Sequence, residues 1–138
     1  MTAKDLFKEG YEHYDKGNYD KAIECFGKSI ELESDYADSY NGIGKAYAAK
    51  GNYDQAIVWY RKAINLKSDF AEAYCDMGFA YYNKGNYDKA ITCYDRAIYL
   101  KSDYALAYKN MEYAYYKKGN YDKAYEYSKK ASMILNKK

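Results

Sequence analysis

Apolar side chains recur along this chain at the spacing of one helical face. Tyr74, Met77 and Tyr81 lie three and then four residues apart, which predicts a helix with one buried side. Gly85 follows, and we expect it to end that helix because glycine readily takes the left-handed backbone of a helix C-terminus. A second apolar stripe, from Ala90 to Leu100, predicts a second helix. The segment is therefore predicted to be a pair of helices joined at a glycine turn.

The two-helix unit occurs four times at a constant interval. The motif Gly-Asn-Tyr-Asp-Lys/Gln-Ala begins every 34 residues, at Gly17, Gly51, Gly85 and Gly119. Counting from these glycines divides the chain into repeats 3–36, 37–70, 71–104 and 105–138. No strand pattern intervenes, so the sequence predicts eight helices in one all-α domain spanning residues 1–138.

Short polar residues near the junctions between repeats predict where helices begin. Asp103 precedes Ala105 by two residues, and aspartate is a favoured N-cap, so we expect it to cap the helix that starts at Ala105. Asp69 and Glu72 lie three residues apart at the preceding junction, which is the spacing of a capping box. Asp88 places an acidic group near the start of the second helix of repeat 3, where its negative charge interacts favourably with the positive end of the helix dipole.

The 34-residue unit resembles the tetratricopeptide repeat. That family has an aromatic residue at position 4, an aliphatic residue at 7, glycine at 8, tyrosine at 11, alanine at 20, an aromatic residue at 24 and alanine at 27. Repeat 2 carries the matching residues Tyr40, Ile43, Gly44, Tyr47, Ala56, Tyr60 and Ala63. Repeat 3 carries Tyr74, Met77, Gly78, Tyr81, Ala90, Tyr94 and Ala97. The family's frequent proline at position 32 is replaced by Ser34, Ser68, Ser102 and Asn136.

The resemblance covers essentially the whole chain and implies both an architecture and a class of function. It implies a right-handed α-α superhelix, a tetratricopeptide solenoid of eight antiparallel helices. It also implies a non-enzymatic protein–protein interaction module that binds a peptide segment or a partner protein in a concave groove. An RNA-reading pentatricopeptide array is the neighbouring alternative, but it has a different period and lacks this signature. Repeats this similar occur in natural arrays and in consensus-engineered ones.

In the family, positions 2, 5, 6, 9, 12 and 13 of each repeat line the groove. Carried over to this chain, the resemblance gives the candidate partner-binding residues Phe7, Tyr11, Tyr14, Asn41, Lys45, Phe79, Tyr82, Lys109, Asn110, Tyr113, Tyr116 and Lys117. Tyrosine combines a large contact area with a hydroxyl group and is enriched at binding hot spots. The alternative is that these rings only cover the inner surface of the array.

A carboxylate clamp for chaperone tails is the best-known ligand mode of the family, and its positions are testable here. The clamp uses lysine, asparagine and arginine from three successive repeats. From repeat 1 its positions hold Phe7, Tyr11, Gly42, Glu72 and Asp76. From repeat 2 they hold Asn41, Lys45, Asp76, Leu106 and Asn110. Neither set fits, so we expect no binding to Hsp70 or Hsp90 C-terminal tails.

The composition of the chain limits which classes of partner and which cellular compartment are expected. The chain has 22 basic and 20 acidic residues, a net charge of +2, and this balance argues against a general nucleic-acid binder. No apolar run approaches the ~20 residues that cross a bilayer, and the N-terminal residues are charged where a secretory signal needs an apolar stretch. Three cysteines cannot all pair, which is typical of reduced thiols. We therefore expect a cytoplasmic protein without a membrane or nucleic-acid partner.

Candidates for catalysis or cofactor binding are few. His13 is the single histidine, and we expect it to be structural or solvent-facing. The segment 41–45 lacks the spacing of a phosphate loop, and the segment 15–20 lacks the closing glutamate of a calcium loop. Cys25 and Cys93 occupy the same repeat position two units apart, which is too far to bind one metal. We therefore expect no enzymatic activity, no cofactor and no metal site.

The two terminal repeats depart from the signature at paired positions. Repeat 1 has Glu9 and His13 where the middle repeats carry aliphatic and tyrosine residues. Repeat 4 has Ser128 and Ser132 where they carry tyrosine and isoleucine. Each pair is four residues apart, so each turns one stripe of a helix polar, as capping repeats require. Glu112 replaces the signature glycine of repeat 4, and we expect it to point outward while the last hairpin packs more loosely.

The terminal repeats also differ in charge. Repeat 1 has five lysines and nine acidic residues, a net charge of −4, whereas repeat 4 has eight lysines and three acidic residues, a net charge of +5. Opposite charge at the two ends favours head-to-tail association. The alternative function is therefore a self-assembling scaffold built by stacking terminal repeats. A solvated charge gradient without a partner is the simpler interpretation.

Overall fold

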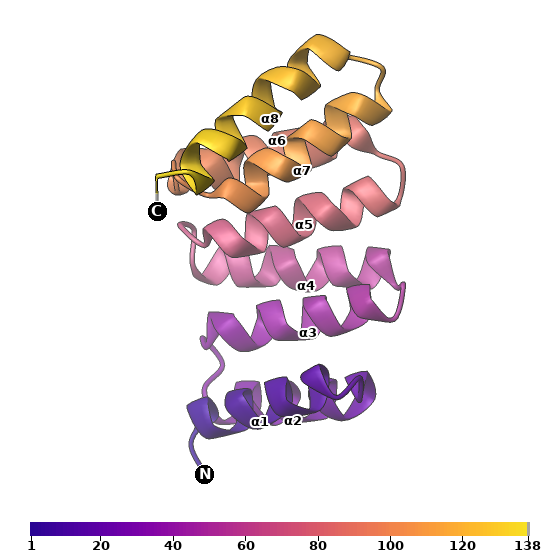
Figure 1. The fold of residues 1–138 in the computed structure, drawn as a ribbon. Helices are drawn as coiled ribbons and strands as arrows, with labels where there is room; N and C mark the ends of the chain where they lie inside the picture. The colour runs from indigo at the N-terminus through magenta and orange to yellow at the C-terminus, as the bar shows by residue number, and fades with distance from the viewer. Residues whose placement is uncertain (138) are drawn as a thin grey trace. The chain divides into compact units, whose positions relative to one another are not determined.

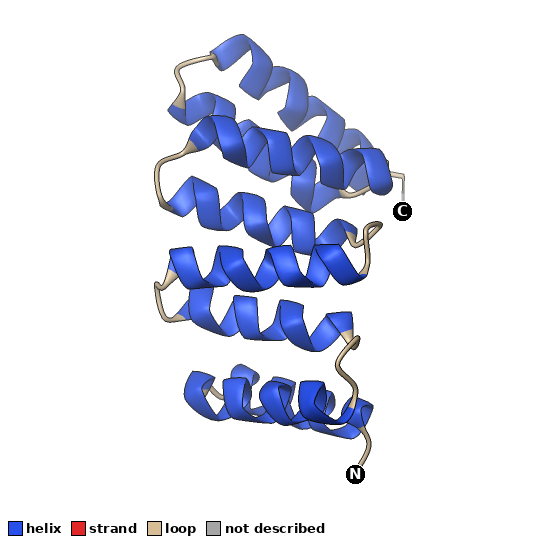
Figure 2. Ribbon diagram, turned by 180° about the vertical axis from the view of Figure 1, so that it is seen from behind, coloured by secondary structure: helices blue, strands red, loops and turns tan. Residues whose placement is uncertain are grey.

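The computed structural model describes residues 1–137, and all regular structure within them is helical (Figures 1 and 2). The chain divides into two compact units, residues 1–68 and the part from residue 69 onward. Unit 1 contains α1 (Ala3–Asp15), α2 (Tyr19–Leu32), α3 (Ala37–Ala49) and α4 (Tyr53–Leu66). Unit 2 contains α5 (Ala71–Asn83), α6 (Tyr87–Leu100), α7 (Ala105–Lys117) and α8 (Tyr121–Leu135). The all-α prediction is confirmed, and the prediction of one domain stays a prediction.

Each repeat is an antiparallel helix hairpin whose turn is set by glycine. The φ angles of Gly17, Gly51, Gly85 and Gly119 are 80°, 83°, 80° and 81°. This left-handed region is disfavoured for residues with a side chain, so the predicted role of these glycines is confirmed. The chain then turns back, and the Asn18 backbone N–H donates to the His13 carbonyl at 2.9 Å. None of the helices within the described residues is long and apolar enough to span a membrane.

The helix starts show which N-cap predictions were right. α5 and α7 begin after Phe70 and Tyr104, and neither helix has a side-chain cap, so the predictions for Asp69 and Asp103 are wrong. An aromatic residue fills the cap position instead, and the aspartates lie one residue too early to reach the first turn. Helix α1 begins with a capping box that was not predicted: the Thr2 N–H donates to Asp5 Oδ2 at 3.0 Å, and the Asp5 N–H donates to Thr2 Oγ1 at 3.1 Å. These bonds lower the pKa of Asp5.

Aromatic rings packed against glycines hold the helices together. In unit 1 the fully buried Phe26 of α2 lies between α1 and α3. A Cβ atom built on Gly10 would lie 2.5 Å from Phe26 Cε1, and one on Gly42 would lie 2.8 Å from Phe26 Cζ. The same type of ring-to-glycine contact joins α3 to α4, where a Cβ on Gly44 would lie 2.5 Å from Tyr60 Cε1. The signature glycines therefore mark places where a ring fills the space of a side chain.

Buried polar groups link adjacent repeats within each unit. In unit 1 the Ser39 hydroxyl donates to Ser29 Oγ at 2.7 Å, and the Ser29 hydroxyl donates to the Ala3 carbonyl at 2.8 Å. In unit 2 the Asn110 amide donates to Cys75 Sγ at 3.7 Å. Burial raises the pKa of the Cys75 thiol to about 12, and the carboxylate of Asp76 adds to the rise. Such satisfied polar contacts fix the register of one hairpin on the next.

The last hairpin buries less than the others. Helix α6 buries Ala90, Ile91, Cys93, Tyr94 and Ala97, whereas α8 buries Ala124 and Ala131. Glu112 is half-buried, and the expectation that its carboxylate reaches outward stays a prediction. In repeats 1 to 3 the glycine position faces an aromatic ring, whereas repeat 4 pairs Glu112 with Ser128 at the equivalent positions. A larger residue and a smaller one have therefore exchanged places, and the aromatic contact is lost.

Candidate functional site

The predicted groove residues form one surface on each unit, along the first helices of its repeats. In unit 1, α1 lies beside α3, and in unit 2, α5 lies beside α7. We call the first the α1–α3 surface, which contains Phe7, Tyr11, Tyr14 and Lys45. We call the second the α5–α7 surface, which contains Phe79, Tyr82, Lys109, Tyr113, Tyr116 and Lys117. The two surfaces differ in how far their aromatic rings are available to a partner.

On the α1–α3 surface the rings pack on one another and on the core. The centroids of Phe7 and Tyr11 are 5.0 Å apart at 80°, and those of Tyr11 and Tyr14 are 5.7 Å apart at 67°. Tyr11 also lies 5.2 Å from the buried ring of Phe26. All three residues are half-buried. These edge-to-face contacts stabilise the hairpin, so covering the core is one role of the rings.

A lysine from the neighbouring repeat lies over two of these rings. Lys45 of α3 places Nζ 5.4 Å from the ring centroid of Tyr11 and 5.6 Å from that of Tyr14. Cation–π contacts of this kind contribute about 0.5–1 kcal/mol where water has access. The lysine therefore joins α3 to α1, and its positive charge remains at the edge of an aromatic face.

The α5–α7 surface is more open. Phe79, Tyr113 and Tyr116 are 49%, 48% and 61% exposed, whereas their counterparts in unit 1 are half-buried. Phe79 stacks on Tyr82 with centroids 6.2 Å apart and planes 6° apart. Leu106 on the same helix as Tyr113 is 54% exposed. Apolar side chains this exposed, along two adjacent helices, are typical of a surface that contacts a partner.

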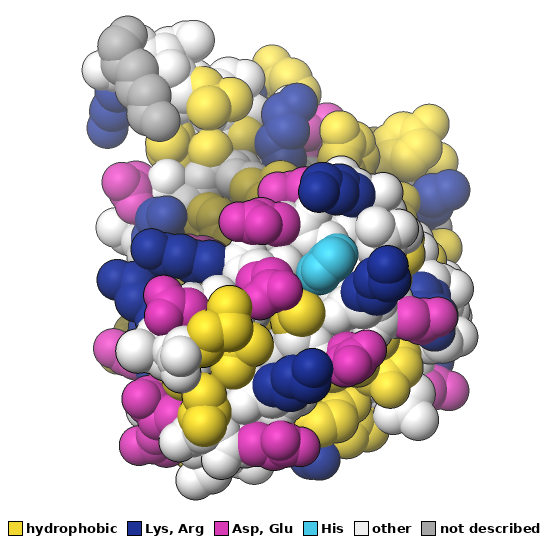
Figure 3. Space-filling model, turned by 90° about the horizontal axis from the view of Figure 1, so that it is seen from below, with side chains coloured by type: hydrophobic (Ala, Val, Ile, Leu, Met, Phe, Trp, Pro, Cys, Tyr) yellow, Lys and Arg dark blue, Asp and Glu magenta, His cyan; other side chains and the backbone are white. Residues whose placement is uncertain are grey.

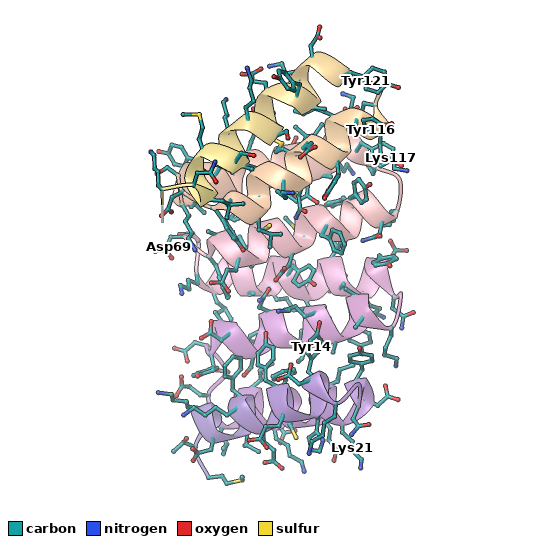
Figure 4. All side chains as sticks on the ribbon, in the orientation of Figure 1. Tyr14, Lys21, Asp69, Tyr116, Lys117 and Tyr121 are labelled. Atoms are coloured by element: carbon teal, nitrogen blue, oxygen red, sulfur yellow. The ribbon has the colours of Figure 1, made fainter. Side chains whose placement is uncertain are left out.

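Lysines accompany the open rings. Lys109 and Lys117 are exposed on α7, and Figure 4 shows Lys117 close to Tyr116 and Tyr121 at the turn between α7 and α8. The next residue, Lys118, forms an ion pair with Asp88 of α6 at 2.5 Å. That hydrogen bond raises the pKa of Lys118. Unit 1 has the equivalent pair between Lys50 and Asp20 at 2.6 Å. Lys50 and Lys118 therefore link adjacent repeats. Lys109 and Lys117 are the lysines that lie exposed on the α5–α7 surface.

The two asparagines of the predicted groove lie below the surface. Asn41 is 4% exposed and Asn110 is 9% exposed. The bond from Asn110 to Cys75 ties α7 to α5, so this side chain serves helix packing. A ligand resting on either surface does not reach these amides without displacing their neighbours, and their part in binding stays a prediction. The position of a residue in the repeat places it on the first helix of the hairpin. Its exposure depends in addition on which side chains from adjacent helices cover it.

A recurring tyrosine pair was missed by the sequence analysis. The rings of Tyr14 and Tyr19 are 5.4 Å apart, and so are those of Tyr82 and Tyr87, while those of Tyr116 and Tyr121 are 5.2 Å apart. In each pair a groove tyrosine meets the tyrosine of the Gly-Asn-Tyr-Asp turn edge to face. The signal was present in the sequence as a five-residue spacing across the turn glycine. The groove tyrosines at this position are therefore oriented by the turn.

Comparisons with known proteins bear on the family. A model described as TPR repeat matches residues 10–51 and 44–85, and models described as tetratricopeptide repeat match residues 71–104 and 111–138. A search of curated proteins gives no significant match. A crystal structure of MamA is 33% identical with a TM-score of 0.88, and the alignment covers 98% of this chain and 79% of that one.

Two further solved structures share the fold at lower identity. Residues 41 to the end of MamA from Desulfovibrio magneticus RS-1 are 18% identical with a TM-score of 0.86, over 99% of this chain and 77% of that one. The first TPR of Spaghetti (RPAP3), bound to the HSP90 peptide SRMEEVD, is 21% identical with a TM-score of 0.78, over 82% and 90%. The matched repeat models and the 33% identical MamA structure show that the chain belongs to the tetratricopeptide repeat family, and the eight helices of residues 1–137 have its all-α solenoid fold.

Proposed function

We propose that the protein is a non-enzymatic interaction module that captures a peptide segment on the α5–α7 surface. Membership of the tetratricopeptide repeat family supports a protein-interaction role in general. The observation that carries the specific proposal is the exposure of Phe79, Tyr113 and Tyr116, each close to half exposed or more, on two adjacent helices. Their rings present large apolar faces whose orientation is partly fixed, so little conformational entropy is lost on binding.

Charge defines the kind of peptide that fits. Lys109 and Lys117 flank the rings and are exposed, and repeat 4 as a whole carries a net charge of +5. A segment with apolar side chains next to carboxylates complements both features. The first TPR of RPAP3, which has the same fold, is bound to the HSP90 peptide SRMEEVD, and this supports a peptide as the kind of ligand. The clamp positions of the present chain hold Glu72, Asp76 and Leu106 among others, so we expect a ligand other than a chaperone tail.

Peptide selection from a random phage-displayed library, panned on the full chain, tests the proposal. We expect enrichment of sequences in which aromatic or aliphatic residues adjoin aspartate or glutamate. Calorimetric titration of one selected peptide then compares the wild type with the double variant Tyr113→Ala/Tyr116→Ala. Truncation of an aromatic hot-spot residue costs about 2 kcal/mol or more and such costs are not additive, so the double variant is expected to bind at least about 30-fold more weakly.

The control removes the same kind of side chain from another face. Tyr99 of α6 is 77% exposed, and the Tyr99→Ala variant is expected to bind the selected peptide as the wild type does. Circular dichroism checks that both variants keep their helix content. Undiminished binding by the Tyr113→Ala/Tyr116→Ala variant rules out the α5–α7 surface as the site.

A self-assembling scaffold is the second candidate, and the apolar surface of α8 favours it. Tyr121, Tyr125, Met133 and Leu135 are 62%, 66%, 62% and 48% exposed. Repeat 1 carries a net charge of −4 against the +5 of repeat 4. A neighbouring chain that stacks its first repeat on α8 covers apolar surface and pairs opposite charges. The interface then has both an apolar and a salt-sensitive component.

Sedimentation velocity at several protein and salt concentrations separates this candidate from a monomeric module. The scaffold predicts association that rises with protein concentration, falls with salt and is lost in Met133→Lys. Val58 on α4 is 46% exposed, and Val58→Lys is the matched control that should still associate. A monomer at every concentration removes the scaffold candidate.

The cytoplasmic location remains part of this proposal. Cys25, Cys75 and Cys93 are buried, and none of them forms a disulfide within the described residues. Thiols that form no disulfide are typical of a reducing compartment. Fluorescence microscopy of the tagged chain in its source cells checks the location, and signal confined outside the cytoplasm contradicts it.

A further inference from the structure

The first hairpin brings three metal-ligating side chains together. Glu9 and His13 lie four residues apart on one face of α1, and Cys25 comes from α2 of the same hairpin. One ligand atom from each of the three lies within 4.8 Å of the other two. Figure 3 shows the face of the molecule that carries the histidine (cyan), with acidic side chains (magenta) beside it. The set combines a carboxylate oxygen, an imidazole nitrogen and a sulfur.

The histidine contributes a second and independent observation. His13 Nδ1 is buried, and it has no hydrogen-bond partner among the described residues. Buried polar atoms are nearly always paired, because an unpaired one costs about 1–3 kcal/mol. A metal ion would supply the missing partner, since a neutral imidazole nitrogen coordinates through its lone pair. The His13 side chain thus has an unpaired ring nitrogen, and a ligand atom of this side chain lies beside a carboxylate and a thiol.

Comparison with repeat 3 shows that repeat packing does not require this cluster. Cys93 occupies the same repeat position as Cys25, and the residues equivalent to Glu9 and His13 are Met77 and Tyr81. Met77, Tyr81 and Cys93 are all buried, as an apolar helix interface should be. Repeat 1 replaces the apolar pair by two ligating groups and keeps the cysteine. The need for a polar end surface explains why Glu9 and His13 are polar. It does not explain why both are residue types that can bind a metal ion, next to the Cys25 thiol.

We propose that Glu9, His13 and Cys25 form a binding site for one divalent transition-metal ion, with Zn²⁺ as the best fit. Zinc accepts sulfur, nitrogen and oxygen ligands together, whereas calcium and magnesium require oxygen ligands. In a tetrahedral zinc site the ligand atoms are roughly 3.4–3.6 Å apart, given bonds of about 2.0–2.3 Å. Separations within 4.8 Å therefore close by side-chain rotation, without a change in the helices.

Three protein ligands leave the fourth zinc position open. That position takes water or a group from another molecule, as in other three-ligand sites. Zinc binds the thiolate, so formation of the Zn–S bond releases the thiol proton of Cys25 to solvent. The bound ion ties α1 to α2 across the first hairpin, and it binds the folded state alone. Zinc is therefore expected to raise the thermal stability of the chain.

Cobalt replaces zinc as a spectroscopic probe in the direct test. The full chain, purified under reducing conditions and freed of metal, is titrated with Co²⁺. We expect one equivalent to bind, with a thiolate-to-cobalt charge-transfer band and the visible bands of a tetrahedral ion, and Zn²⁺ to displace it. His13→Gln is expected to bind at least about tenfold more weakly, since even outer-shell partners are worth 10–100-fold. Cys25→Ser is expected to lose the charge-transfer band.

Cys93→Ser is the matched control, because it removes a buried thiol from the equivalent position of repeat 3. It should keep both the stoichiometry and the charge-transfer band. Circular dichroism of each metal-free variant confirms that the helices remain, and Glu9→Gln provides a further variant if Cys25→Ser does not fold. Binding that is absent, that lacks the thiolate band, or that persists unchanged in His13→Gln and Cys25→Ser overturns the proposal.

Discussion

The substitution Gly10→Ala tests the packing of aromatic rings against glycines. A methyl group at this position would meet Phe26 Cε1, Cδ1 and Cζ at 2.5, 2.7 and 3.0 Å. The ring is fully buried, and on its other side a Cβ on Gly42 would lie 2.8 Å from the same Cζ atom. Because it is held from both sides, the ring has no free space into which to move. The added methyl group is therefore expected to separate α1 from α2.

The magnitude follows from two opposing effects. Overpacking a well-filled core costs about 1–3 kcal/mol. Replacing glycine by alanine inside a helix returns about 0.5–1 kcal/mol. Gly27→Ala isolates the second effect, because Gly27 also lies within a helix and a Cβ on it meets nothing within 4 Å. Gly27→Ala should stabilise the chain, and the difference between the two variants should equal the overpacking cost of about 1–3 kcal/mol.

Urea unfolding provides the assay. The single tryptophan, Trp59, lies in α4 of unit 1, so its fluorescence reports on the unit that contains Gly10. A smaller ring should relieve the clash, so Gly10→Ala should cost less in a Phe26→Leu background than in the wild type. If Gly10→Ala is as stable as Gly27→Ala, the glycine does not serve close packing and the reasoning is refuted.

Three further predictions concern the turns, the buried titratable groups and the ligand. Gly85→Ala should lower the free energy of unfolding by about 1 kcal/mol or more, because φ is 80° there; an unchanged urea midpoint contradicts this. Burial raises the pKa of Cys75 to about 12 from 9.0 and also raises that of Tyr94 above 10.0, so the unfolded chain loses these protons first. The contribution of these two groups to stability should be constant below about pH 9 and fall from there toward pH 12, as urea midpoints at pH 8 and 10.5 will show; equal midpoints at the two pH values contradict it. The peptide SRMEEVD should bind no better than a scrambled version in calorimetry, and specific binding would show that the clamp analysis is wrong.

The sequence predicted those features that depend on local backbone geometry and on periodicity. The apolar spacing and the turn glycines were sufficient to predict the eight helices that residues 1–137 contain, since each turn glycine takes a conformation that other residues avoid. The predicted caps at Asp69 and Asp103 failed because the aromatic residue after each aspartate occupies the cap position. The preference of aspartate for an N-cap depends on local sequence, whereas the position of an aromatic ring depends on packing across the whole hairpin.

The candidate surfaces were predicted in part. Their residues followed from repeat position, but the exposure of Tyr113 and the burial of Asn110 depend on which side chains from adjacent helices cover them. The cluster of Glu9, His13 and Cys25 was visible as separate departures from the repeat pattern. The three side chains come together only because α1 packs on α2, which brings two residues of α1 close to one residue of α2.

Mapping of a bound peptide by nuclear magnetic resonance tests the central claim most directly. Backbone amide shifts of the labelled full chain are recorded with and without the selected peptide. The proposal predicts the largest changes in α5 and α7, centred on Phe79, Tyr113 and Tyr116. Changes confined to the outer helices α6 and α8, with those three residues unaffected, would contradict it.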